Sequence, residues 1–258
     1  MAAVFAVVNQ KGGVGKTTTA VSLAACLAAE GRKSLLVDTD PQGNATSGVG
    51  VVKSSVGECI YDVLINDVPI ERVIMPTDTP NLALVPARLD LAGADIELMS
   101  MMSRERKLKQ ALKRVEADYE FIVIDCPPSL GLLTVNVLTA ARYVILPIQC
   151  EYYALEGISQ LLRTIDLVRQ HLNPELEIAS VLLTMFDYRT NLSQQVVDEV
   201  RRFFGEKVSS VLVPRNVRLS EAPSHGKPIT SYDPKSKGAE AYRKFSAEVI
   251  AFGEKRSG

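Results

Sequence analysis

The sequence has 258 residues, of which 47% are hydrophobic and 23% are charged, and its formal net charge is −1. These values exclude a disordered or fibrous chain and are typical of a globular protein that buries about 70–75% of its unfolded surface. No apolar run approaches the ~20 residues that a membrane helix needs, and the N-terminal MAAVFAVV lacks the cationic start of a signal peptide. We therefore expect a cytoplasmic protein that forms a single domain over residues 1–258.

Short apolar runs rich in β-branched residues alternate with helical patterns along the chain. The first run, residues 4–9, precedes a glycine-rich loop and an alanine-rich helix predicted over residues 17–30, which a glycine ends. Further strands are predicted at residues 34–38, 82–86, 121–125, 143–147 and 178–185. Amphipathic helices are predicted at residues 104–117 and 193–204, the second with Ser193 as its N-cap. This alternation predicts an α/β fold, with a mostly parallel β-sheet covered by helices on both faces.

Two stretches show no regular pattern. Residues 42–80 are the least regular, and we interpret them as a mobile insertion over a binding site. Residues 214–234 are rich in proline and polar side chains. In parallel α/β folds, ligands bind at loops that follow the carboxyl ends of strands, so both stretches are candidates for lining a site.

The loop after the first predicted strand carries a phosphate-binding motif. It consists of Gly12, Gly13, Val14, Gly15, Lys16, Thr17 and Thr18. The glycines let the backbone turn tightly and direct its N–H groups at phosphate oxygens, and the helix that follows adds the positive end of its dipole. Lys16 would neutralise the β- and γ-phosphates, and the Thr17 hydroxyl would bind Mg²⁺. Because strand, loop, lysine, hydroxyl and helix occur in this order, the sequence predicts a P-loop NTPase.

Two other predicted strands end in carboxylates. The hydrophobic residues 121–125 end in Asp125, which is the form of a Walker B element that holds Mg²⁺ through water. Residues 34–38 end in Asp38, and Asp40 follows after one residue. A carboxylate at the end of a strand also serves as a turn former, and the residues alone leave that alternative open.

The remaining reactive side chains form no catalytic motif. The four cysteines, Cys26, Cys59, Cys126 and Cys150, contain no CxxC pair, so we expect buried reduced thiols. The hydroxyl of Ser129 and the imidazoles of His171 and His225 lie in no nucleophile motif. We therefore expect phosphoryl transfer to water without a covalent intermediate.

The complete loop from Lys11 to Thr18, with a second lysine at its head, resembles the deviant Walker A box KGGxGKT[ST] of the ParA/MinD superfamily of ATPases. This resemblance implies ATP and Mg²⁺ as cofactors and a homodimer in which Lys11 reaches the phosphates of the partner's nucleotide. The segment LLVDTDPQGN resembles the switch I region of the ParA branch, and IDCPPSLG resembles its Walker B and switch II region. By that resemblance Asp38 supports the magnesium shell together with Asp125, and Asp40 orients the attacking water. Lys11, Lys16 and Asp40 are then the expected catalytic residues.

The resemblance extends over nearly the whole chain. Residues 183–187 and 213–223 look like the purine-side segments of chromosome and plasmid partition ATPases of the ParA (Soj) type. The resemblance implies that Pro214 and Asn216 contact adenine and that Met185 lines the pocket. Prolines and asparagines are also common turn residues, which is an open alternative for these positions.

The positive charge is concentrated late in the chain. Residues 185–258 contain 13 Lys/Arg and 9 Asp/Glu, whereas residues 1–184 contain 16 Lys/Arg and 21 Asp/Glu. Such charges bind phosphates without reading bases, and the resemblance implies that Arg189 and Arg218 bind double-stranded DNA nonspecifically. The alternative to DNA binding, for any single basic residue, is that it only lies on a solvated face of the protein. By resemblance, we expect an ATP-driven switch on the nucleoid that segregates DNA, with a ParB-type protein speeding hydrolysis.

Three other functions stay open. A related ATPase could position a protein cargo with the same chemistry, and a metabolic enzyme could use the P-loop on a small molecule. A MinD-like protein would bind membranes through a C-terminal amphipathic helix. The C-terminal residues do have an apolar face at helical spacing, which consists of Tyr242, Phe245, Val249 and Phe252. Packing of that face on the protein's own core explains it equally well, so we expect no membrane binding.

Overall fold

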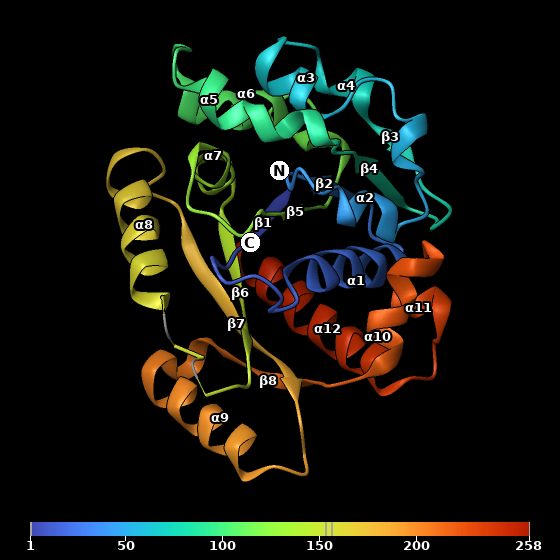
Figure 1. Ribbon diagram of the computed structural model, residues 1–258, viewed down its shortest axis with the longest axis vertical. Coiled ribbons are helices and arrows are strands. Elements are labelled where there is room, and N and C mark those ends of the chain that lie inside the picture. The colour runs from blue at the N-terminus through green and yellow to red at the C-terminus, as the bar shows by residue number, and fades with distance from the viewer. Residues whose placement is uncertain (1, 153, 156, 258) are drawn as a thin grey trace.

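A single twisted sheet runs through the centre of the molecule (Figure 1). The computed structural model describes residues 2–152, 154–155 and 157–257. The eight strands are β1 (Ala3–Val7), β2 (Ser34–Asp38), β3 (Met75–Pro76), β4 (Leu82–Val85), β5 (Phe121–Asp125), β6 (Tyr143–Gln149), β7 (Glu177–Phe186) and β8 (Val208–Pro214). Their order in the sheet is β3-β4-β2-β5-β1-β6-β7-β8, and every neighbouring pair is parallel except β3 with β4. The predicted fold class is confirmed.

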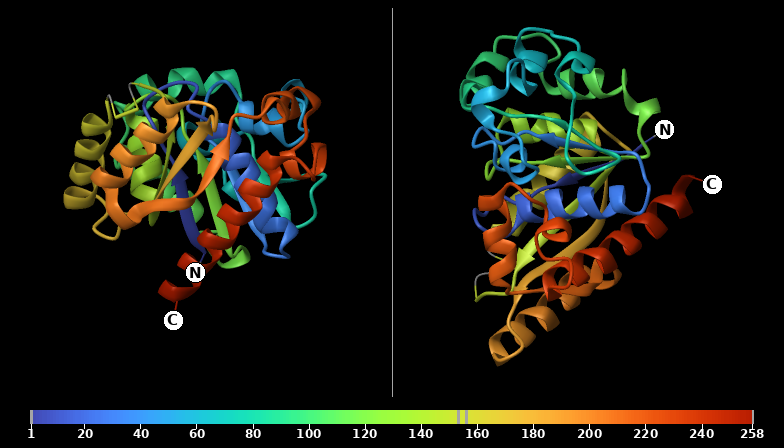
Figure 2. Two further views of the ribbon diagram at one scale, coloured as in Figure 1. Left: turned by 90° about the horizontal axis from the view of Figure 1, so that it is seen from below. Right: turned by 90° about the vertical axis from the view of Figure 1, so that its right-hand side faces the viewer.

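Helices cover both faces of this sheet (Figure 2). One face packs against α3 (Ile60–Ile65), α4 (Ile70–Val73), α5 (Ala94–Leu98), α6 (Lys107–Leu112), α7 (Leu132–Ala140), α8 (Ile158–His171) and α9 (Asn191–Phe204). The other face packs against α1 (Lys16–Ala29), α2 (Asn44–Gly48), α11 (Ile229–Tyr232) and α12 (Lys237–Ser257). The short helix α10 (Val217–Glu221) precedes α11. The result is a three-layer arrangement with a separate hydrophobic core on each side of the sheet.

The strand sequences explain the two cores. Successive side chains of a strand point to opposite faces, so a strand covered on both sides is apolar throughout. In β1, Val4 and Ala6 belong to one core, and Phe5 and Val7 belong to the other. The parallel order brings the carboxyl ends of β1, β2 and β5 to one edge of the sheet, where the loops after them meet.

Two strands of the structure were absent from the sequence prediction. The edge strand β8 contains two serines in its first half, which weakens its apolar pattern. The strand β3 has only two residues, one of them Pro76, and pairs antiparallel with β4 at the other edge. Both strands lie at edges of the sheet. An edge strand has one neighbouring strand instead of two, so its sequence need not be continuously apolar.

Two helix predictions need correction. The segment predicted as one helix over residues 104–117 divides into the 3₁₀ turn Arg104–Arg106, the helix α6 and the 3₁₀ turn Glu116–Asp118. The N-cap of α9 is Thr190 rather than Ser193. The Thr190 hydroxyl accepts a hydrogen bond from the Ser193 backbone N–H, which is the usual capping geometry three residues into a helix.

The two irregular stretches contain short helices. Residues 42–80 form α2, the 3₁₀ turn Lys53–Ser55, α3, α4 and β3, so they are not an unstructured loop. Residues 214–234 form α10, the 3₁₀ turn Ala222–His225 and α11. Their helices have only four to six residues, which explains why no helical periodicity is visible in the sequence.

The C-terminal helix α12 uses its apolar face inside the molecule. Tyr242, Phe245 and Val249 are buried in the core that also contains α1. The ring of Phe252 packs edge-on against that of Tyr143, with their centroids 5.0 Å apart. Within the part of the chain that the structure describes, we find no helix with the length and apolar character that crossing a bilayer requires.

Candidate functional site

The glycine-rich loop joins β1 to α1. Gly13 and Gly15 have φ angles of 76° and 90°, in the left-handed region that disfavours side chains. Gly15 is the N-cap of α1 and provides no side-chain hydrogen bond to the helix. The first N–H groups of α1 therefore face the loop without a capping side chain, which is the arrangement that binds an anion.

Lys16 lies inside this loop rather than on its surface. Its side chain extends back along the loop, and its Nζ donates a hydrogen bond to the main-chain oxygen of Lys11 at 2.9 Å. The residue is only 7% exposed. Burial lowers the pKa of the Lys16 ammonium, and the nearby Asp125 and Asp40 carboxylates oppose that effect. A desolvated cation at this position would gain strongly from an anionic ligand.

Side chains at the ends of neighbouring strands hold the loop in place. The Thr184 hydroxyl, on β7, donates to the main-chain oxygen of Val14 at 2.8 Å. Asn9 donates to the main-chain oxygen of Pro147 at 2.8 Å and accepts from the backbone N–H of Lys11 at 2.9 Å. Thr184 and Asn9 were not among the predicted site residues, because their contacts depend on strands that are distant in sequence.

Asp38 and Asp125 are direct neighbours in the sheet, at the ends of β2 and β5. Both are fully buried. One carboxylate oxygen of Asp38 accepts hydrogen bonds from the backbone N–H and the hydroxyl of Thr46, at 2.7 and 2.8 Å, and the other accepts from the backbone N–H of Asp40 at 3.1 Å. Burial nevertheless raises the pKa of Asp38 to about 6. Asp38 thus fixes the start of α2 as well as facing Asp125.

Asp125 has a different environment. Neither of its carboxylate oxygens has a hydrogen-bond partner among the described residues. Burial first, and then the charge of Asp38, raise the pKa of Asp125 well above its ordinary value. The nearby Thr17 hydroxyl makes no hydrogen bond to the Asp125 carboxylate but partly offsets this rise in its pKa. A buried carboxylate without a partner, close to a threonine hydroxyl and to Lys16, fits a site for a hydrated divalent cation.

The donor set around Asp125 also limits which cation site is possible. The described residues contain no group of three or more His, Cys, Asp or Glu side chains that could enclose a metal ion. A cation here would therefore take most of its ligands from water and phosphate oxygens. That is the coordination Mg²⁺ prefers in nucleotide sites, so the residues fit Mg²⁺ better than a transition metal.

Asp40 lies on the loop between β2 and α2. It is 7% exposed, and its carboxylate accepts a hydrogen bond from the backbone N–H of Gln42 at 2.9 Å. The preceding Thr39 ties this loop to β5, because its hydroxyl donates to the main-chain oxygen of Asp125 at 2.5 Å. The structure thus brings Lys16, Asp40 and Asp125 into one electrostatically connected group.

The predicted adenine-side residues lie at the ends of β7 and β8. Met185 is half-buried and has a φ of 53°, a left-handed conformation that is uncommon for a residue with a side chain. Phe186 next to it pairs with the buried Pro214. The Asn216 side chain accepts from the backbone N–H of Arg218 at 2.9 Å and caps α10. Asn216 thus has the turn-forming role, and an adenine contact by its amide stays a prediction.

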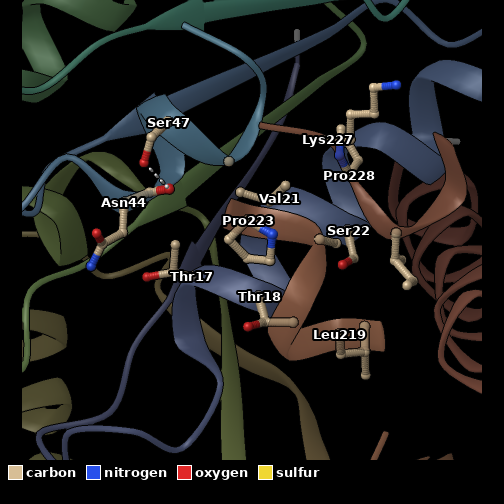
Figure 3. A pocket seen from close by; sticks show the side chains of 13 residues that line it. Thr17, Thr18, Val21, Ser22, Asn44, Ser47, Leu219, Pro223, Lys227 and Pro228 are labelled. Carbon is tan, nitrogen blue, oxygen red and sulfur yellow. Dashed lines mark hydrogen bonds between the residues drawn. The ribbon is translucent and has the colours of Figure 1, made fainter. Parts of the chain in front are cut away.

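A cavity of about 250 Å³ lies beside the phosphate loop (Figure 3). Thr17 and Thr18 of α1 line it together with Asn44 and Ser47 of α2. Its other walls come from Val21, Ser22, Gly48, Leu219, Ala222, Pro223, Lys227, Pro228 and Ile229. The cavity therefore joins the phosphate loop to both irregular stretches, as expected for loops at the carboxyl ends of parallel strands.

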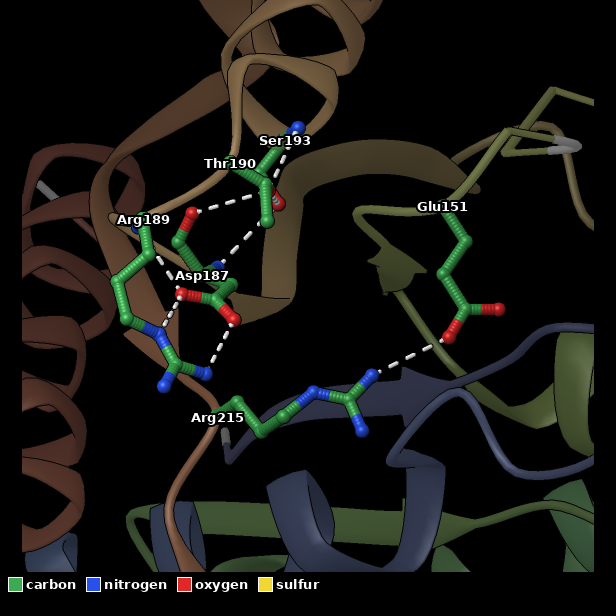
Figure 4. Close-up of polar contacts among 6 residues, drawn as sticks. All are labelled: Glu151, Asp187, Arg189, Thr190, Ser193 and Arg215. Carbon is green, nitrogen blue, oxygen red and sulfur yellow. Dashed lines mark hydrogen bonds and ion pairs between the residues drawn. The ribbon is translucent and has the colours of Figure 1, made fainter.

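The two predicted DNA-binding arginines are each paired with an acid. Arg189 forms two side-chain hydrogen bonds to Asp187, at 2.9 and 2.8 Å, while its side chain stays 85% exposed (Figure 4). The Arg189 guanidinium holds the pKa of the Asp187 carboxyl well below its usual range. Arg218 pairs with Glu221 at 2.8 Å. Both arginines are accessible, yet part of their charge is compensated within the chain.

Comparison with known proteins matches this chain over most of its length. The family model described as AAA domain matches residues 2–178. The sporulation initiation inhibitor protein Soj of Bacillus subtilis is 58% identical over 253 residues, which cover 98% of this chain and 100% of Soj. The chromosome partitioning protein ParA of Myxococcus xanthus is 56% identical over 247 residues, which cover 96% of this chain and 87% of that protein.

A solved structure shares the same fold. It is described as cobyrinic acid a,c-diamide synthase from Mycobacterium smegmatis with bound ADP and magnesium. It superposes with a TM-score of 0.86 and 42% sequence identity, covering 97% of this chain and 94% of the other. That agreement extends over all three layers of the fold.

Proposed function

Because this chain belongs to the ParA/Soj family of chromosome-partitioning ATPases, we propose that it is an ATP-driven switch that dimerises, binds DNA and drives its segregation. The observation that carries the proposal is the loop with two lysines beside the buried Asp125 carboxylate, which has no hydrogen-bond partner among the described residues. Lys16 and Lys11 are linked within the loop, and Asp125 lies close enough to act on the Lys16 charge. These groups are suited to binding and hydrolysing a nucleoside triphosphate.

ATP and Mg²⁺ are the cofactors that fit the site. Thr17 and Asp125 would hold the cation, with Asp38 supporting them from the neighbouring strand. When bound, Mg²⁺ neutralises charge on the phosphate oxygens. The loop N–H groups and the N-terminus of α1 bind the phosphates, while Lys16 leaves the Lys11 carbonyl to contact them.

Hydrolysis requires a positioned water and little else from the protein. We assign that positioning to Asp40, whose carboxylate lies on the loop after β2, near Lys16. The water oxygen attacks the γ-phosphorus, the bond from phosphorus to the β–γ bridging oxygen breaks, ADP leaves, and the inorganic phosphate that forms keeps the two protons of the water. Positioning and charge neutralisation supply most of the catalysis in such transfers, so no covalent intermediate is needed.

The second lysine supports a dimer. Within the described chain, Lys11 contributes hydrogen bonds through its backbone N–H and carbonyl, and we find none from its side chain. Lys11 also lines an open cavity of about 490 Å³, together with Gln10 and residues 128–130. In the proposed dimer the Lys11 ammonium reaches the phosphates bound by the partner chain, so that ATP completes the interface.

DNA binding and the partner protein complete the proposed cycle. Arg189 and Arg218 are exposed cations in the basic part of the chain, and dimerisation doubles their number on one assembly. We propose that the ATP-bound dimer associates with the nucleoid through nonspecific contacts. A ParB-type DNA-binding protein then stimulates hydrolysis and returns the chain to the monomer.

Three alternatives differ in substrate, in location or in cargo. The similar M. smegmatis structure is described as a cobyrinic acid a,c-diamide synthase, which keeps a metabolic enzyme open. The sequence identities to Soj and ParA, over almost the entire chain, are higher than the identity to that structure, which argues against a metabolic enzyme. A membrane-binding switch is disfavoured because the apolar face of α12 is buried in the core. A related ATPase that positions a protein cargo would use the same site.

Phosphate release by the purified protein tests the proposal. We expect slow Mg²⁺-dependent hydrolysis of ATP that duplex DNA and a ParB-type protein together accelerate, and no hydrolysis by Lys16→Ala. Turnover that requires cobyrinic acid and an amide donor, and that ignores DNA, would support the metabolic alternative. ATP-dependent sedimentation with anionic vesicles would support the membrane alternative.

A further inference from the structure

The helix α7 begins just after the segment that carries Asp125. Residues 126–131 connect the end of β5 to the start of α7, and they include two prolines. Pro128, Ser129 and Leu130 also line the cavity that contains Lys11. The position of the start of α7 therefore sets where residues 126–131 lie beside Lys11 in the phosphate loop.

The start of α7 is held by a residue of another helix. Its N-cap is Gly131, which has no side chain to cap the helix. Instead, the Asp95 carboxylate of α5 accepts a hydrogen bond from the backbone N–H of Leu133 at 2.8 Å. A carboxylate at this place satisfies a free N–H and lies at the positive end of the helix dipole.

The Asp95 carboxylate lies directly against the Cα of Gly131, so a larger residue at position 131 would displace it. A Cβ added to Gly131 would lie 2.5 Å from one carboxylate oxygen of Asp95. The backbone of Gly131 has φ −75° and ψ −171°, which any residue adopts. A side chain at position 131 would therefore disturb the Asp95 carboxylate rather than the backbone. A further clamp is Asn136 of α7, which donates to the main-chain oxygen of Arg104 at 2.7 Å.

We infer that Asp95 is a positioning residue for ATP hydrolysis. It fixes the N-terminus of α7 and thereby the position of residues 126–131, which follow Asp125. Residues 128–130 line the cavity that contains Lys11, so Asp95 holds this side of the nucleotide site in place. Asp95 acts through its hydrogen bond to α7. The inference deepens the proposed function and rests on it, because it concerns the same hydrolysis.

The test compares Asp95→Ala with a matched control. Asp62 also caps a helix, since its carboxylate accepts from the backbone N–H of Cys59 at 2.9 Å, but no residue of its helix α3 lines the cavities that contain Thr17 or Lys11. We expect Asp95→Ala to lower kcat about tenfold and to leave KM for ATP within about twofold, because a displacement well under 1 Å costs less than the ~100-fold of a full ångström. Asp62→Ala should lower the melting temperature similarly and keep kcat.

Two more variants separate positioning from folding. Asp95→Asn keeps an acceptor oxygen and should restore kcat to near the parent value. Gly131→Ala keeps Asp95 but displaces its carboxylate, and should lower kcat as Asp95→Ala does, with no further loss in the double variant. An unchanged kcat in both Asp95→Ala and Gly131→Ala, an equal loss in Asp62→Ala, or a change confined to KM would overturn the inference. If the parent protein itself failed to hydrolyse ATP, the proposed function would fail instead.

Discussion

Lys16 and Lys11 are linked inside the phosphate loop, because the Lys16 ammonium donates to the Lys11 main-chain oxygen at 2.9 Å. One lysine thus points into the loop while the other contributes only its backbone there. In the proposed function, the Lys16 side chain contacts the nucleotide and the Lys11 side chain contacts a partner chain. The predictions for the two residues differ for this reason.

We predict that Lys16→Ala abolishes nucleotide binding. The substitution removes a buried cation, and truncating one partner of a buried charged contact costs about 2–5 kcal/mol, or at least about 30-fold in affinity. Isothermal titration with Mg·ATP measures the loss directly. Lys113→Ala, which removes an exposed lysine far along the chain, is the control. An affinity close to that of the parent protein would be inconsistent with the assigned role of Lys16.

Lys11→Ala should leave ATP binding by the monomer largely intact, because its side chain makes no hydrogen bond within the described chain. It should prevent ATP-dependent dimerisation. Light scattering during size-exclusion chromatography, with ATP and with ADP, distinguishes the two states. A Lys11→Ala protein that still elutes as a dimer with ATP would refute the role across the interface.

Asp40→Ala is expected to bind ATP and form the dimer but to hydrolyse ATP about 100-fold more slowly, since misplacing a reacting group by about 1 Å costs on the order of 100-fold. The dimer should therefore accumulate. Single-turnover phosphate release and light scattering on the same sample test both parts. Hydrolysis at the parent rate would leave Asp40 with only its turn contact to Gln42.

Asp125→Asn should stabilise the nucleotide-free protein while weakening Mg²⁺-dependent nucleotide binding. The pKa of Asp125 is raised in the folded state, so the unfolded chain loses this proton first, and the stability of the parent protein falls as pH rises from the ordinary value of 3.8 through the folded value. The variant should therefore melt at a higher temperature than the parent at pH 8, and the difference should vanish near pH 4. Calorimetry at several pH values decides this. A variant less stable than the parent at pH 8 would contradict the buried, uncompensated charge.

The phosphate loop and the central strands could be predicted because their signals are local. A glycine-rich loop between an apolar strand and a helix, or a buried strand that ends in Asp125, is contained in fewer than about 20 consecutive residues. The same holds for Asp38, whose strand is apolar on both faces. Edge strand β8 escaped prediction because its serines reduce the apolar pattern.

The contacts that position the site could not be predicted from local patterns. Asp95 caps α7 from 38 residues away, and Thr184 holds the loop at Val14 from 170 residues away. Such contacts arise only when the strand order is known. The pairing of Arg189 with Asp187 is local, but a sequence of alternating charges does not show which cations are compensated. The roles assigned to Met185, Pro214 and Asn216 stay predictions.

We propose that ATP makes a dimer whose joined basic surfaces bind DNA. The decisive measurement is fluorescence anisotropy of a labelled random duplex, titrated at several salt concentrations with ATP and with ADP. We predict tight binding with ATP, weak binding with ADP, and a steep loss with salt, because log K falls by about 0.9 per phosphate neutralised for each unit of log salt. Arg189→Glu and Arg218→Glu should abolish this binding and keep the ATP-dependent dimer. Equal affinity in ATP and ADP, or no binding with either nucleotide, would contradict the account.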